Sequence, residues 1–150
     1  MNKLLTFILI NAINLFLCLS SQASDFSFTG NFAADDDVQL FGFSVGAPSI
    51  VTLQTLSYAG GTNAAGVDIS AGGFDPILAV FDSDDLFIAD NDDGTFPDVG
   101  IDPVTGEAFD TYLQLSLSAG DHTVAVSQYD NFFNGVFGDP LSSGFLRQAV

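Results

Sequence analysis

Residues 73–94 constrain the fold of this chain more than any other stretch. Two short apolar runs, at 77–81 and 86–89, are separated by aspartates and followed by the acidic run DNDDG at 90–94. Short apolar runs bounded by turn-forming residues are typical of strands. The stretch therefore predicts a buried strand, its hairpin partner, and an acidic loop that leaves the sheet at residue 90.

Most of the chain after residue 24 has the same strand-like character. Apolar and polar residues alternate over 25–32, 38–45 and 49–56, and a brief edge strand is expected at 67–69. A long acidic loop follows at 95–110, then two strands at 112–117 and 122–128, joined by a turn with hairpin chemistry. Residues 131–150 are rich in Phe and Gly and show no clear period.

No segment after residue 24 has helical spacing over about ten residues. We therefore expect an all-β fold, an antiparallel β-sandwich or jelly roll of about eight strands. A closed up-and-down barrel is the alternative architecture.

Residues 1–23 have the composition of a secretory signal peptide. Lys3 precedes an apolar region at 4–19, and Ser21 and Ala23 place small residues where a signal peptidase cuts. The alternative is a retained transmembrane helix. Cys18 is the single cysteine and would leave with the signal, so core packing or a bound metal must stabilise the domain at 24–150. We expect a secreted protein, extracellular or at the cell surface, with the periplasm as the alternative.

The charge balance narrows the range of partners. Nineteen Asp and Glu face two Lys and Arg, which gives a formal net charge of −17. Such a chain repels nucleic acid and anionic membranes and attracts divalent cations. A hydrophobic content of 47%, with sixteen Phe, supplies a core and argues against a disordered acidic chain.

Calcium is the ligand that the acidic loop favours. Calcium takes six to eight oxygen ligands, several of them carboxylates, on a loop that can wrap around the ion. The spacing is not that of an EF-hand, because placing Gly94 at the sixth loop position puts Ala89 and Gly100 at the first and twelfth. The alternative is a solvated loop with Asx turns. The candidate calcium ligands are Asp90, Asn91, Asp92, Asp93, Asp98, Asp102 and Asp110.

Two patterns that suggest catalysis have simpler interpretations. Ser44 lies in a G-x-S-x-G sequence, but Pro48 and a further β pattern follow where a nucleophile elbow needs a helix. His122 has no metal-ligand partner at a useful spacing. We interpret both as ordinary strand residues, assign no catalytic residue, and expect that the protein is not an enzyme.

Three motifs carry a family resemblance. DPILAVFD at 75–82, LFIADNDD at 86–93 and SAGDHTVAV at 118–126 resemble the core signature of bacterial pre-peptidase C-terminal domains. The resemblance implies a β-sandwich module of that type over residues 24–150. His122 departs from the pattern, because the family usually has Tyr or Phe there.

Further motifs resemble a narrower group of uncharacterised secreted proteins from Gram-negative bacteria. These motifs are FTGNF at 28–32, DDV at 36–38, SYAGGTN at 57–63 and QYDN at 128–131. That group commonly ends in a PEP-CTERM sorting tail read by exosortase, which this sequence lacks. Members also tend to have another strand after a segment like 143–145, so we expect the domain to lack its final strand.

Together these observations predict a secreted, non-catalytic module stabilised by calcium. Its expected role is adhesive, in the matrix or at the cell surface, with extracellular matrix or polysaccharide as the partner and no nucleic acid. One alternative is a hydrolase that uses carboxylates to act on extracellular polysaccharide. The other is a purely structural accessory domain whose loop binds nothing.

Overall fold

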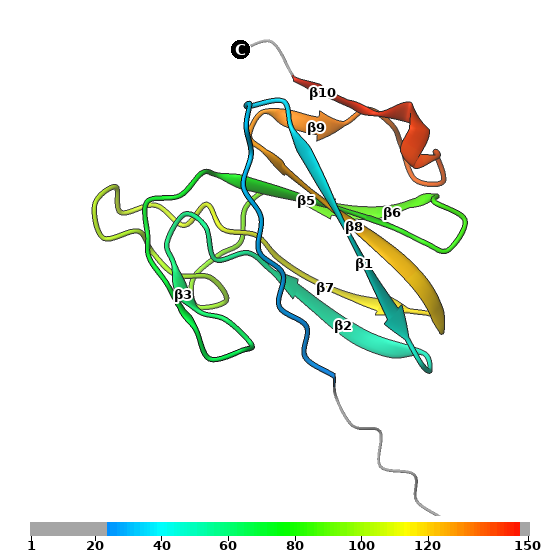
Figure 1. The fold of residues 1–150 in the computed structure, drawn as a ribbon, viewed down its shortest axis with the longest axis horizontal. Coiled ribbons are helices and arrows are strands. Elements are labelled where there is room, and N and C mark those ends of the chain that lie inside the picture. Colours follow the sequence, from blue (N-terminus) through cyan, green and yellow to red (C-terminus); the bar gives the residue numbers. More distant parts are fainter. Residues whose placement is uncertain (1–23, 148–150) are drawn as a thin grey trace, which may run out of the picture.

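The computed structural model describes residues 24–147, and the expected signal peptide at 1–23 lies outside them. The described chain is nearly all strand, as the sequence predicts, and its antiparallel sheets form a sandwich (Figure 1). In chain order the elements are β1 (Val38–Val45), β2 (Ser49–Gln54), β3 (Gly61–Thr62), β4 (Asp68–Ile69), β5 (Pro76–Phe81), β6 (Phe87–Asn91), β7 (Tyr112–Leu117), β8 (Gly120–Gln128), β9 (Asn131–Phe133), the 3₁₀ helix η1 (Leu141–Ser143) and β10 (Phe145–Arg147).

A four-stranded sheet in the order β1-β8-β5-β6 is the centre of the fold. The predicted hairpin of residues 77–89 is confirmed as β5 and β6, which pair antiparallel with a register shift between Val80 and Phe81. The predicted hairpin at 118–121 is wrong. Strand β7 pairs with β2 in a separate sheet, whereas β8 pairs with β1 and β5, so this turn connects two layers.

Strand β5 is buried on both faces, because a layer covers each side of the central sheet (Figure 1). On one face, Leu78 and Val80 pack with Leu53 of β2 and Leu113 of β7. On the other face, the side chain of Phe81 belongs to a second cluster, with Phe133 of β9, Phe87, Leu141 and Phe145. The uninterrupted apolar sequence of β5 therefore reflects a strand that lies between two cores.

The C-terminal region supplies the second of these cores. Phe133 of β9 makes an edge-on contact with Phe81, with ring centroids 5.0 Å apart, and β10 pairs with β9. Arg147, on β10, donates from Nε to Asp130 over 2.9 Å, and its Nη1 lies 3.4 Å from Asp35. Residues 131–147 showed no period in the sequence because each element in this cover is only three residues long.

The predicted strand at 25–32 is wrong. Residues 24–32 are extended but form no strand with any described part of the chain. Side chains hold this segment in place: the ring of Phe28 packs on Phe41 of β1, with centroids 5.0 Å apart, and the Gln39 amide donates to the carbonyl of Asn31. Phe26 and Phe28 remain about half exposed. Alternation alone does not make a strand, because the backbone also needs a partner edge. Within residues 24–147, no helix has the length and apolar character needed to span a bilayer.

Candidate metal centre

Three carboxylates meet where the β5–β6 pair ends. Asp75 directly precedes β5, and Asp92 and Asp93 directly follow β6. Because the two strands are antiparallel, with Leu78 opposite Asn91, the start of one and the end of the other lie at the same edge. One oxygen from each of the three carboxylates lies within 4.8 Å of the other two. The register of the β5–β6 hairpin thus brings Asp75 close to Asp92 and Asp93, although both strands and their turn separate them in the sequence.

Two of these carboxylates are incompletely satisfied. Asp75 and Asp92 are partly buried, whereas Asp93 is exposed. The Oδ1 atoms of Asp75 and Asp92 are buried, and neither has a hydrogen-bond partner in the described chain. Buried polar atoms without partners are rare in folded proteins and cost free energy. An ion that bound both atoms would remove this cost.

The three carboxyl groups are also harder to ionise than ordinary aspartates. Burial, followed by the charges of Asp93, Asp92 and Asp110, raises the pKa of Asp75 to about 7. Burial, followed by the charges of Asp93 and Asp90, raises the pKa of Asp92 to about 6. Burial also raises the pKa of Asp93. Near neutral pH these groups therefore need either protons or a cation, and a hard divalent cation suits carboxylate oxygens.

Asp92 and Asp93 are the two sequence-predicted ligands that the structure brings together, and they meet Asp75, which was not predicted. Asp90 lies on β6 opposite Ala79, with an exposed side chain outside this group. The Asn91 side chain is used locally: its Oδ1 accepts from the Tyr112 backbone N–H over 3.0 Å, and its Nδ2 donates to the Asp93 carbonyl.

Both carboxylate oxygens of Asp110 accept hydrogen bonds within the fold. Asp110 is 1% exposed. Its Oδ1 accepts from the backbone N–H groups of Ser57 and Tyr58 and from the Thr55 hydroxyl, over 2.6 to 3.1 Å. Its Oδ2 accepts from the Ala59 N–H over 2.7 Å. One buried carboxylate therefore fixes the chain after β2, and its charge contributes to raising the pKa of Asp75.

Asp98 and Asp102 lie away from the three carboxylates. Asp98 is exposed in the loop after β6, where its backbone carbonyl accepts from the Gln54 amide over 3.0 Å. The buried Asp102 caps its own turn. Its Oδ1 accepts from the N–H groups of Thr105 and Val104, and these bonds, that of Thr105 foremost, lower the pKa of Asp102.

The residues that suggested catalysis do not meet. Ser44 lies within β1, as predicted, and its hydroxyl donates to Asp121 Oδ1. The register places Phe43, not Ser44, opposite His122, so serine and imidazole project from opposite faces of the sheet. His122 is 4% exposed, lies against the Phe43 ring, and has Nε2 3.1 Å from the Ser118 carbonyl.

Asp75 could have been found from the sequence by a register argument. An acid that directly precedes one strand of a short hairpin lies near the acids that directly follow the other strand. The acidic run that marks candidate ligands in the sequence begins at residue 90, and Asp75 lies outside it.

Comparison of the chain with protein-family models, with curated proteins and with solved structures finds no match.

Proposed function

We propose that this protein is a secreted, non-catalytic β-sandwich module of the pre-peptidase C-terminal type, stabilised by a calcium ion held by Asp75, Asp92 and Asp93. Its role is adhesive, in the matrix or at the surface of a Gram-negative bacterium. The observation that carries the proposal is the meeting of three carboxylates, two of which have a buried oxygen without a hydrogen-bond partner in the described chain.

The donor set suits calcium better than a softer metal. The three groups supply only hard oxygen ligands, and water molecules would complete the coordination shell. Calcium accepts six to eight such oxygens in flexible geometry, whereas magnesium demands a near-ideal octahedron. A site at the meeting point of a strand start and a strand end also joins two parts of the fold, so ion binding would stabilise the folded state.

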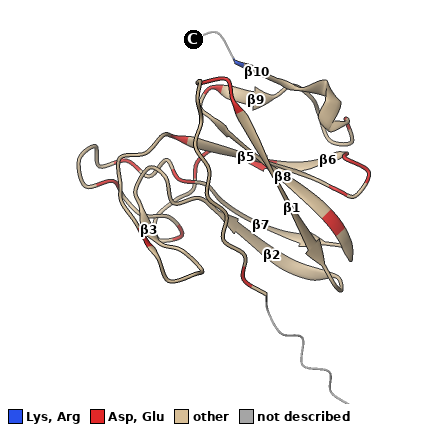
Figure 2. Cartoon of the chain, in the orientation of Figure 1, with Lys and Arg blue, Asp and Glu red and all other residues tan. Residues whose placement is uncertain are grey.

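The adhesive role rests on the acidic surface and on the resemblance to exported modules. Acidic residues are spread over the loops and strand ends, and the one blue segment of the cartoon is at the end of β10, where Arg147 lies (Figure 2). A surface of this kind can bind a matrix component through bound divalent cations or through the component's own positive charge.

Isothermal titration calorimetry with calcium and with magnesium tests the metal claim. We expect calcium to bind one site on the wild-type chain, magnesium to bind more weakly, and Asp92→Asn to weaken calcium binding at least tenfold. Asp98→Asn is the matched control, because Asp98 is an exposed loop acid outside the three-carboxylate group. If Asp98→Asn weakens binding as much as Asp92→Asn does, the acidic loop attracts calcium diffusely and the proposed site is wrong.

A carboxylate-dependent hydrolase is the second candidate, because one observation favours it. Asp75, with its pKa raised to about 7, could donate a proton near neutral pH while a neighbouring carboxylate stays ionised. A screen of extracellular polysaccharides for released reducing ends decides this point, with Asp75→Asn as the control. Turnover that disappears in Asp75→Asn would replace the non-catalytic proposal, and the absence of both turnover and calcium binding would leave the structural accessory domain.

A further inference from the structure

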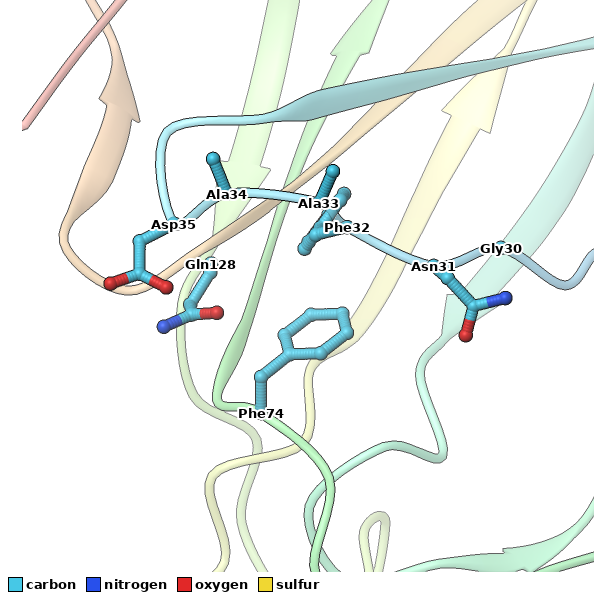
Figure 3. A pocket seen from close by; sticks show the side chains of 8 residues that line it. All are labelled: Gly30, Asn31, Phe32, Ala33, Ala34, Asp35, Phe74 and Gln128. Carbon is cyan, nitrogen blue, oxygen red and sulfur yellow. The ribbon is translucent and has the colours of Figure 1, made fainter.

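A second site lies where the N-terminal segment crosses the sheet. Residues 30–35 of that segment, together with Phe74 and Gln128, enclose a pocket of about 260 Å³ (Figure 3). None of these residues belongs to the metal centre, although Phe74 directly precedes Asp75 in the chain. The volume falls below the roughly 300–1,000 Å³ of typical small-molecule sites, so the pocket suits a single chemical group or a side chain.

Two aromatic rings form the apolar part of the pocket. The rings of Phe32 and Phe74 are tilted by 43°, with centroids 4.7 Å apart. Both side chains are only partly buried, and in Figure 3 the Phe74 ring lies beneath the segment that carries Phe32. The face of an aromatic ring carries partial negative charge and attracts cations.

Two polar groups lie on one side of the Phe74 ring. Asp35 and Gln128 both line the pocket, and in the view of Figure 3 both lie to one side of the Phe74 ring. Gln128 is half-buried at the end of β8, and its Oε1 can accept a hydrogen bond from a ligand. Asp35 is largely exposed, and the guanidinium of Arg147 already lies 3.4 Å from its carboxylate. A ligand cation would therefore share the Asp35 carboxylate with Arg147 or replace Arg147 there.

The negative charge around the pocket favours a cationic ligand. Asp36 and Asp37 follow Asp35, and the whole chain carries a formal charge of −17. An anionic ligand would be repelled, and a neutral one would gain nothing from this field. A cation would gain from the field, from the Asp35 carboxylate and from the ring face, and each contribution acts at a different point of the pocket.

We propose that this pocket binds an ammonium or guanidinium group, with the cation over the Phe74 ring and hydrogen-bonded to Asp35 and to Gln128 Oε1. The group belongs to a small amine or to a Lys or Arg side chain of a partner protein, which share the same chemistry. The site is independent of the metal centre, because calcium requires oxygen ligands and gains little from an aromatic wall.

The test follows binding by NMR on the isotope-labelled protein in chelator, which keeps the metal centre free of calcium. The probes are arginine methyl ester and a hexa-arginine peptide, each matched by sodium chloride at equal ionic strength. We expect the two arginine probes to shift the side-chain amide signals of Gln128 and the ring signals of Phe74. Tighter binding of the peptide than of the ester identifies a basic segment of a partner, and equal binding identifies a small amine.

Four variants separate the pocket from general attraction to an acidic protein. Phe74→Leu keeps the charge and removes the ring, and Asp35→Asn removes the carboxylate; each should weaken binding of the ester at least tenfold. Phe137→Leu and Asp84→Asn are the matched controls, because both side chains are exposed and lie outside the pocket. Both controls should bind like the wild type.

Gln128→Glu keeps the proposal testable if Phe74→Leu does not fold. The added carboxylate should tighten binding of the ester, which a purely structural role of Gln128 would not predict. The proposal is overturned if the Gln128 and Phe74 signals do not shift with ester up to about 50 mM. It is also overturned if Phe74→Leu and Asp35→Asn bind as tightly as the two controls. Failure here would not affect the metal centre, whose calcium titration uses none of these residues.

Discussion

Asp75 and Asp92 each bury one carboxylate oxygen that has no hydrogen-bond partner in the described chain, and an oxygen of each lies within 4.8 Å of the other. Two like charges held so close, with Asp93 beside them, oppose one another unless protons or a cation neutralise them. The hairpin register, rather than a loop motif, creates this arrangement. Stability should therefore depend on both pH and calcium.

In the absence of metal, stability should fall as the pH rises from about 4 to about 7. The pKa of Asp75 is about 7 and that of Asp92 about 6 in the folded chain, against 3.8 for an unperturbed group. The folded state therefore binds these protons more tightly than the unfolded state does. The stabilisation from these bound protons is complete at pH values below the pKa of the unfolded state. It is lost as the pH rises through the pKa values of the folded state. Thermal melts in chelator across this range measure the effect.

A variant is needed to isolate the contribution of Asp75 from those of the other carboxylates. Asp75→Asn has no titrating group at residue 75. Its melting temperature should therefore fall less than that of the wild type between pH 4 and pH 7. Parallel curves for the two proteins would show that the pKa of Asp75 is not raised. Calcium should act in the opposite direction, because it competes with protons for the same oxygens, so its stabilising effect should grow with pH.

Removing the Asp110 carboxylate should destabilise the fold whether or not calcium is present. Asp110→Ala leaves the backbone N–H groups of residues 57–59 without their acceptor, which should cost about 3 kcal/mol or more. Denaturant unfolding in calcium and in chelator should give the same loss. A loss confined to calcium would instead make Asp110 a ligand, as the sequence predicted.

Phe133 should contribute far more to stability than Phe137, a nearby aromatic of the same size. Phe133 is 8% exposed and contacts Phe81, whereas Phe137 is 78% exposed. Phe133→Ala should lower the free energy of unfolding by about 3–5 kcal/mol, and Phe137→Ala should change it by no more than about 0.5 kcal/mol. Equal effects in denaturant titrations would contradict the packing of β9 and β10 against the central sheet.

The sequence predicts most of the sandwich because local patterns determine most of its strands. The strand at 38–45 is confirmed with the same bounds, and the run at 77–81 is confirmed as the buried strand. Pairing between distant segments was harder to predict. The turn at 118–121 has hairpin chemistry, yet β7 and β8 pair in different sheets, because the partners of β8 are β1 and β5.

The candidate site could be predicted only in part, for a related reason. Asp92 and Asp93 were predicted because they lie in an obvious acidic loop. Asp75 comes from across the hairpin, and only the register places it beside them. Asp110 and Asp102 are predicted as ligands by the same acidic pattern, but backbone N–H groups already donate to both oxygens of Asp110 and to Oδ1 of Asp102. Composition does not distinguish an acid that binds a metal from one that caps a turn.

The melting temperature (Tm) of Asp75→Asn in chelator and in calcium is the most direct test of the proposed calcium site. Without metal, the variant should melt above the wild type at neutral pH, because it lacks one of the mutually repelling charges. Calcium at about 100-fold excess over its Kd should raise the wild-type Tm by roughly 5–15 °C. The same calcium should leave the Tm of Asp75→Asn nearly unchanged. A wild-type Tm that is the same in calcium and in chelator would contradict the proposed metal centre.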